Sequence, residues 1–433
     1  MIGLMRCSHR FASGVLLLAA CSAHGQSLSV DLRDALARAR AYNQQFLAST
    51  TGAALAQEDR VQFKRALLPQ AAHVSQYVYT EGNGTPAGVF VANNGVHEYS
   101  EVALVHADVY APGKLAEYRR AQAAESAARA RRDIALRGLS TVVVQNYYAV
   151  IGTQRRLENV RQSVQEAQRF LDITSKQEQG GEVAHTDVIR AQLQVRLRQR
   201  EQLDTENAVQ HAKLNLGVML FQDITQTYEA VDDLGSDKPL PPGVQVETAA
   251  FSNNPALRAA EANVQQAGYS VKSTRAAYLP LVSVDYFYGI NANQFAIHNP
   301  DGQRNLGSVV QGTMTVPVWN WGITRSRVRQ AELVRQQAET ELTLARRQVQ
   351  ADVRGFSFEA QTARTQLESL RGSMDLAAES VRLTLLRYQA GESTALEVVD
   401  TQSTLAQARN DYADGLARYR LALANIEVLT GAL

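Results

Sequence analysis

Apolar residues recur every three or four positions through two very long stretches of the chain, residues 113–238 and 318–433, and neither stretch contains a proline. Both are rich in Ala, Leu, Gln, Glu and Arg. This spacing is typical of amphipathic helices, and proline is the strongest helix breaker. The pattern therefore predicts that each stretch is almost entirely helical.

Each stretch has one conspicuous interruption, at Gly180-Gly181 and at Gly391. Glycine adopts the left-handed conformation that ends many helices, so we expect two helical hairpins. Their outgoing arms, residues 113–179 and 322–390, would each be about 100 Å long at 1.5 Å per residue. The return arms would cover residues 183–221 and 394–429. No compact domain needs so long a helix, whereas a coiled-coil rod or a tunnel does.

Two shorter windows, residues 69–112 and 280–317, are bracketed by prolines and change to a period of two. In the second window Val282, Val284, Tyr286 and Tyr288 share one face, and Ser283 lies on the other. Residues 313–318 continue this alternation, and residues 101–104 follow it more weakly. Turn-forming sequences at 82–86 and 299–302 divide each window into two strands and a loop.

The two halves of the chain align with one another. Leu279-Pro280 follows Leu68-Pro69 by 211 positions, and Gly391 follows Gly181 by 210. Near-constant offsets predict an internal duplication. We expect a first repeat at 28–222 with strands at about 70–111, a proline-containing linker or equatorial segment at 223–244, and a second repeat at 245–431 with strands at about 281–318.

The first 25 residues have the features of a signal peptide. Arg6 and Arg10 precede an apolar run at 15–20, and small residues at 23–25 allow cleavage before Gln26. The run 18–21, Leu-Ala-Ala-Cys, also resembles a lipoprotein signal, in which the cut falls before Cys21 and that residue is acylated. Both readings predict export.

Composition and motifs exclude several classes of function. A net charge of +1 with 7% aromatic residues provides no basic surface for nucleic acid. The eight histidines have no metal-ligand spacing, and no catalytic or phosphate-binding motif occurs. We therefore predict no enzyme activity, no metal and no cofactor. His73 and His106 are interpreted as polar residues of strands that face a lumen.

The strand count has a consequence for assembly. Four strands cannot close on themselves, so the chain must oligomerise to span a membrane. Two copies would give eight strands and three would give twelve, and the residues do not decide between them. Trp319 and Trp321 follow the last strand, where they would form either an interfacial aromatic belt or packing anchors at the strand-to-helix junction.

Several motifs together resemble the TolC-type outer-membrane efflux proteins. They are the Leu-Pro pairs before the strands, residues 316–322 (Val-Pro-Val-Trp-Asn-Trp-Gly), residues 387–393 (Arg-Tyr-Gln-Ala-Gly-Glu-Ser) and the duplicated layout. The resemblance covers essentially the whole mature chain. It implies an α+β membrane protein and a homotrimer. In it, four β-strands per protomer form a 12-stranded outer-membrane β-barrel, and long α-helical hairpins form an α-barrel across the periplasm.

The resemblance also implies a function and a site. The chain would be the passive exit duct of a tripartite efflux pump, joined by a periplasmic adaptor protein to an inner-membrane transporter. The periplasmic tips would form the closed entrance and the adaptor-docking surface. By position these tip residues are Gly180, Gly181, Glu182, Arg387, Tyr388, Gly391, Glu392 and Ser393.

Two alternatives stay open. The chain could be the exit duct of a type I protein secretion system, or an exported coiled-coil scaffold without a pore. The tips could then be simple helix turns. The residues reveal neither the cargo nor the gate residues of the entrance.

Overall fold

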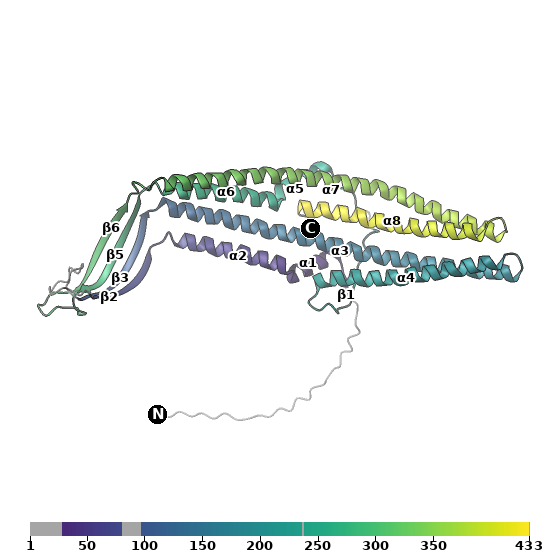
Figure 1. Ribbon diagram of the computed structural model, residues 1–433, viewed down its shortest axis with the longest axis horizontal. Coiled ribbons are helices and arrows are strands. Elements are labelled where there is room, and N and C mark those ends of the chain that lie inside the picture. Colours follow the sequence, from purple (N-terminus) through teal and green to yellow (C-terminus); the bar gives the residue numbers. More distant parts are fainter. Residues whose placement is uncertain (1–27, 80–96, 236–237, 433) are drawn as a thin grey trace, which may run out of the picture.

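The computed structural model describes residues 28–79, 97–235 and 238–432, and these form one elongated molecule. A β-sheet lies at one end and two helical hairpin turns lie at the other (Figure 1). The predicted signal peptide, Cys21 and the predicted turn at 82–86 lie outside the described residues.

Two helices run the whole length between the sheet and the tips: α3 (Pro112–Gln179) with 68 residues and α7 (Ile323–Gln389) with 67. At 1.5 Å per residue each is about 100 Å long. From the tips, α4 (His185–Leu220) and α8 (Ala395–Thr430) return about halfway (Figure 1). The predicted long helical hairpins are confirmed.

Shorter helices fill the sheet-proximal half. In the first half of the chain these are α1 (Leu32–Tyr42) and α2 (Gln44–Arg65). In the second half they are α5 (Gly243–Asn253) and α6 (Pro255–Ala276). The lateral order is therefore α2–α3–α6–α7 near the sheet and α4–α3–α8–α7 near the tips.

Both pairs of short helices are broken at an asparagine. Asn43 and Asn254 have extended backbone angles and end one helix while capping the next. The Asn43 side chain accepts a hydrogen bond from the Phe46 amide at 2.8 Å, and the Asn254 side chain accepts one from Ala256 at 2.8 Å. These side chains satisfy amides that the start of a helix leaves unpaired.

The sheet has the strand order β2 (Gln70–Tyr79), β3 (His97–Tyr110), β5 (Leu281–Ala292) and β6 (Leu306–Thr315), and every pair is antiparallel. β6 ends three residues before the predicted limit at Val318. Pro317 has no amide hydrogen to donate to a neighbouring strand, which explains the early end.

The molecule is thus a ribbon with two unlike long edges. One edge consists of β2, α2 and α4, and the other consists of β6 and α7. Each helical edge exposes large apolar side chains near the tips: Ile189, Leu193 and Leu197 on α4, and Leu376, Leu383 and Leu386 on α7.

The largest core cluster lies at the equator, where the short helices give way to the return arms. β1 (Leu28–Val30) pairs in parallel with β4 (Tyr228–Ala230) there, and both strands share this cluster with α3. Tyr147 and Ile151 of α3 and Leu216 of α4 are fully buried in this cluster. The sequence reading had not predicted either strand, and β4 lies in the segment interpreted as a linker.

Candidate functional site

The two hairpin turns at the tips have the same backbone geometry. At the first tip the Gly181 amide donates to the carbonyl of Glu178 and the Glu182 amide donates to that of Gln177, both at 2.8 Å. At the second tip the Gly391 and Glu392 amides make the matching bonds at 3.0 and 2.8 Å. The φ angles of Gly181 and Gly391 are +77° and +78°, in the left-handed region that favours glycine. Both helices therefore end in a Schellman motif.

The side chains around the two turns differ. At the first tip, His185 Nδ1 lies 2.6 Å from the Glu178 carboxylate. At the second tip, the Arg387 guanidinium donates to the Glu392 carbonyl at 3.1 Å. The two tips therefore present different charges on one backbone frame.

Helix α8 begins with a polar cap at the second tip. The Glu397 amide donates to Thr394 Oγ1 at 3.3 Å, and the Ser393 hydroxyl donates to the Glu397 carboxylate at 2.6 Å. The Ser393 bond lowers the pKa of Glu397 below its usual range. The equivalent position before α4 is Ala184, which has no side chain able to cap.

The structure corrects the placement of Tyr388. Its side chain is only 3% exposed, so it does not lie on the tip surface as predicted. Its ring meets Phe170 of α3 edge-on with the ring centroids 5.2 Å apart, and its hydroxyl bonds to Thr174 Oγ1 at 3.3 Å. Burial raises the pKa of the Tyr388 hydroxyl. Tyr388 therefore joins the two hairpins. The predicted residues Gly180, Gly181, Glu182, Arg387, Gly391 and Glu392 are exposed, and Ser393 is half-buried.

A second charged contact joins the hairpins further from the tips. Arg409 of α8 donates to the Glu166 carboxylate of α3 at 2.9 Å, with both side chains about three-quarters buried. Closer to the equator, the Asn159 side-chain amide of α3 donates to Asn410 Oδ1 of α8 at 3.2 Å. The hairpins are thus held together along their length by polar pairs as well as by Tyr388.

The two faces of the sheet differ in polarity. One carries Val284, Tyr286 and Val310, and the other carries Asp285 and Gln311, as the register of β5 with β6 shows. The first is the apolar face that the sequence predicted. Its main polar interruption is Glu101, which bonds to Ser75 and lies 3.0 Å from His73.

This register corrects the interpretation of the two strand histidines. His106 pairs with Asp285 on the polar face, with 2.6 Å between His106 Nδ1 and the carboxylate. His73 lies opposite Ala103 and shares the face of Tyr288, so it does not face the same side as His106. The two histidines were expected on one face, and the structure separates them.

The tryptophans stand at the junction between the sheet and α7. Trp319 and Trp321 are 76% and 87% exposed, and their rings pack edge-on with 5.7 Å between centroids. Trp321 has a φ of +54°, and Gly322 follows it with +82°. The turn presents both rings away from the body of the protomer.

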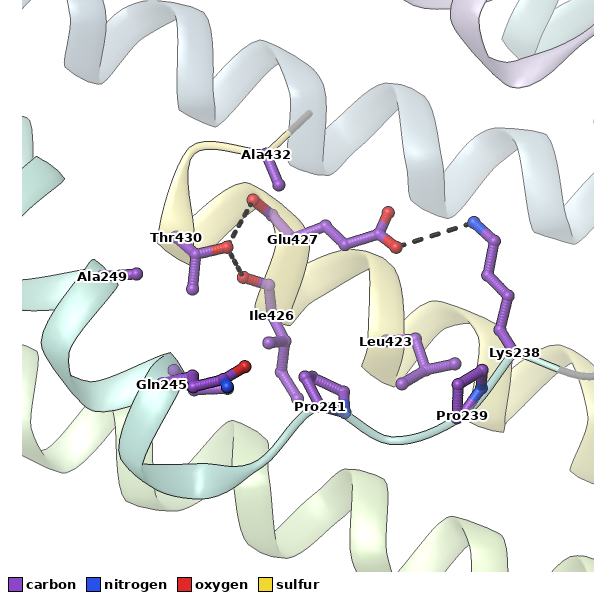
Figure 2. A pocket seen from close by; sticks show the side chains of 11 residues that line it. Lys238, Pro239, Pro241, Gln245, Ala249, Leu423, Ile426, Glu427, Thr430 and Ala432 are labelled. Atoms are coloured by element: carbon purple, nitrogen blue, oxygen red, sulfur yellow. Dashed lines mark hydrogen bonds and ion pairs between the residues drawn. The ribbon is translucent and has the colours of Figure 1, made fainter.

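An apolar cavity of about 400 Å³ lies at the equator between the 238–241 segment, α5 and the end of α8 (Figure 2). Pro239, Pro241 and Ile426 line it, and Lys238 pairs with Glu427 at its rim at 3.6 Å.

No group of three metal-ligating side chains occurs among the described residues. In that same part of the chain, no helix combines the length and the apolar character required to cross a membrane.

Comparisons with known proteins identify a protein family and individual proteins that this chain resembles. Residues 248–432 match the model of the family described as outer membrane efflux protein. The outer membrane protein TolC of Vibrio cholerae serotype O1 is 24% identical over 375 residues, which is 86% of this chain and 83% of that protein. The pyoverdine export outer membrane protein OpmQ of Pseudomonas putida is 27% identical over 63% of this chain and 57% of its own length.

A solved structure has the same fold. The outer membrane protein VceC of Vibrio cholerae superposes with a TM-score of 0.77 at 16% identity, over 92% of this chain and 96% of that one. The shared fold and the family match agree with the sequence resemblance. Residues 248–432 therefore match the outer membrane efflux protein family, and the chain as a whole has the fold of the outer membrane protein VceC.

Proposed function

We propose that this protein is the passive exit duct of a tripartite efflux pump. The observation that carries the proposal is the separation of two unlike ends, a sheet with one apolar face and a pair of exposed helical turns, by unbroken helices about 100 Å long. Such a molecule joins a membrane to a distant partner. The duct would be passive, and the energy for transport would come from that partner.

The two edges of the ribbon support assembly of copies side by side. β2 and β6 are each paired on one side only, and α4 and α7 expose leucines along the same two edges. Because the edges differ, the β2 edge of one copy meets the β6 edge of the next, and such head-to-tail contacts close into a ring. Three copies would give a closed sheet of twelve strands above a ring of helices.

The sheet would then stand in the outer membrane with its apolar face toward lipid. Trp319 and Trp321 would lie at the level of the headgroups on the periplasmic side, where amphipathic rings are favoured. Their exposure in the protomer supports this position. The helices would extend into the periplasm.

The tips would dock the periplasmic adaptor protein, which connects the duct to the inner-membrane transporter. Glu182 and Glu392 occupy equivalent, exposed positions at the ends of the two Schellman turns. Arg387 and the exposed glycines beside them complete this surface. Tyr388 supports it from beneath.

Conductance in planar bilayers tests the channel. We expect the purified protein to be a trimer in native mass spectrometry and to give discrete ion conductance after reconstitution. A folded trimer that does not conduct would refute the duct and would favour the scaffold without a pore. A monomer under non-denaturing conditions would refute the ring.

Photo-crosslinking tests the docking surface. A photoreactive residue at Glu182 or Glu392 should capture the adaptor protein in cells. The same residue at Glu229, an exposed position of β4 at the equator, is the matched control and should not capture it. Equal capture from all three positions would contradict docking at the tips.

A further inference from the structure

The polar face of the sheet is organised in rows that cross all the strands. One row consists of Gln70, His106, Asp285 and Gln311. Two rows further toward the loops come Val74, Val102, Gly289 and Gly307, and between them lie Ala72, Leu104, Phe287 and Val309. Beyond these, Gln76, Ser100 and Asn291 form another polar row. A belt two rows high on this face is therefore apolar, with amide and hydroxyl groups above it.

Two glycines that face each other hollow out this belt. Gly289 pairs with Gly307 across β5 and β6. A Cβ atom on Gly289 would lie 2.0 Å from the Glu101 carbonyl oxygen, so the strands approach too closely there for any side chain. A Cβ atom on Gly307 would meet nothing within 4 Å, so that position opens onto free space.

The result is a hollow of about 480 Å³ on the polar face. Val74, Val102, Phe287 and Val309 form its apolar wall, and Gln76, Ser100 and Gln311 contribute polar groups at its rim. This volume is within the range of small-molecule sites, and an apolar wall with few polar groups is the usual composition of such sites.

The chemistry of the wall selects a class of ligand. No charged side chain is among the described residues that line the hollow. Ionisable groups on this face stand at its two ends: His106 and Asp285 share the row of Gln311 and lie 2.6 Å from each other, and Glu98 lies one row beyond Ser100. Amides and hydroxyls both donate and accept hydrogen bonds, so they suit a neutral polar group. An ion would lose its hydration here without gaining a partner of opposite charge.

We propose that this hollow is a binding site on the channel wall for uncharged amphipathic small molecules, with an aromatic or aliphatic body against the glycine belt and neutral polar groups at the rim. The inference rests on the proposed duct, because the polar face becomes the inner wall only when the sheet closes. It gives the duct a substrate class, namely uncharged amphipathic molecules. Such molecules would contact this site on the channel wall near the exit.

Single-channel recording in planar bilayers tests the site, with 2-naphthyl β-D-glucoside as the probe and glucose as its polar control. The probe should cause reversible partial blocks of the current, whereas glucose should cause none. Naphthalene-2-sulfonate has the same rings with a charge and should block more weakly. Equal block by the sulfonate would overturn the neutral ligand class.

Variants on the two faces of β6 provide matched controls. Gly307→Phe fills the hollow and should shorten the blocks about tenfold or more, since the ligand loses several buried methylene equivalents. Gly312→Phe places the same side chain on the opposite face, where nothing lies within 4 Å of its Cβ atom, and should leave the blocks unchanged.

A pair of smaller substitutions provides a second test in case the phenylalanine variants do not fold. Val309→Thr keeps the shape of the wall but replaces a methyl with a hydroxyl, and should shorten the blocks roughly fourfold, the factor expected for one buried methyl group. Val310→Thr on the other face should have no effect. A wild-type channel that conducts without being blocked, or equal effects on both faces, would overturn the site. A protein that does not conduct would instead refute the duct.

Discussion

Tyr388 allows the connection between the two hairpins to be weighed by mutation. Replacing it with alanine removes the largest side chain of a small cluster that otherwise contains Phe170, Ala191, Ala395 and Val398. Truncation of a buried aromatic residue in this way typically destabilises by about 3–5 kcal/mol. The cluster belongs only to the tips, so the loss should appear as local separation of the hairpins and not as global unfolding.

Tyr388→Phe separates the ring from the hydroxyl. Thr174 keeps its bond to the Phe170 carbonyl at 2.9 Å when the tyrosine hydroxyl is removed, so no buried group is left without a partner. The Tyr388 bond is long at 3.3 Å, and we expect its loss to destabilise by no more than about 1 kcal/mol. Most of the stabilisation therefore lies in the ring.

Hydrogen exchange followed by mass spectrometry measures the difference. For Tyr388→Ala, amide protection of the last turns of α3 and α7 should fall by roughly two to four orders of magnitude, which is the factor for about 3–5 kcal/mol. The equatorial peptides should not change. Leu396→Ala is the matched control, because that side chain is 51% exposed at the start of α8 in the same tip. Equal loss of protection in the two alanine variants would refute the role assigned to Tyr388.

Three further outcomes are expected. Gly391→Ala should destabilise the second tip by about 1 kcal/mol, because the φ of Gly391 is positive. Gly372→Ala lies within α7 and should stabilise that helix by a similar amount. Amide exchange rates that move in the same direction in the two variants would contradict this. Since the pKa of Glu397 is lowered, its cap stabilises the tip above the usual carboxylate pKa and is lost as pH falls through the folded value; exchange at the start of α8 should rise with acid in the wild type, and Glu397→Gln should abolish that pH dependence. The fluorescence of Trp319 and Trp321, the only tryptophans, should be quenched more by lipids brominated near the headgroup than by lipids brominated near the chain end, and the reverse order would move them out of the interface.

Local backbone chemistry explains what the sequence could predict. The left-handed glycines Gly181 and Gly391 and the helix-excluding prolines act within a few residues of themselves, so the hairpins and strand windows followed directly from their positions. The breaks at Asn43 and Asn254 were missed, since asparagine is compatible with a helix interior and becomes a cap only where the chain turns.

Long-range contacts explain what the sequence could not predict. Tyr388 stands beside a turn glycine, and its burial depends on Phe170 in the other hairpin. β1 and β4 have three residues each, too few to show a period, and their partners are 200 positions apart. The apolar belt around Gly289 lies on the face that contains Asp285, so alternation along β5 alone assigned that face as polar.

The unlike edges of the ribbon have a consequence for genetics. A protomer whose α7 edge is damaged keeps an intact α4 edge, so it can still bind one neighbour but cannot complete a ring. In a cell that makes both forms, such a chain would trap normal copies in open assemblies. Lesions on one edge should therefore be dominant over the wild-type allele, whereas lesions that unfold the protomer should be recessive.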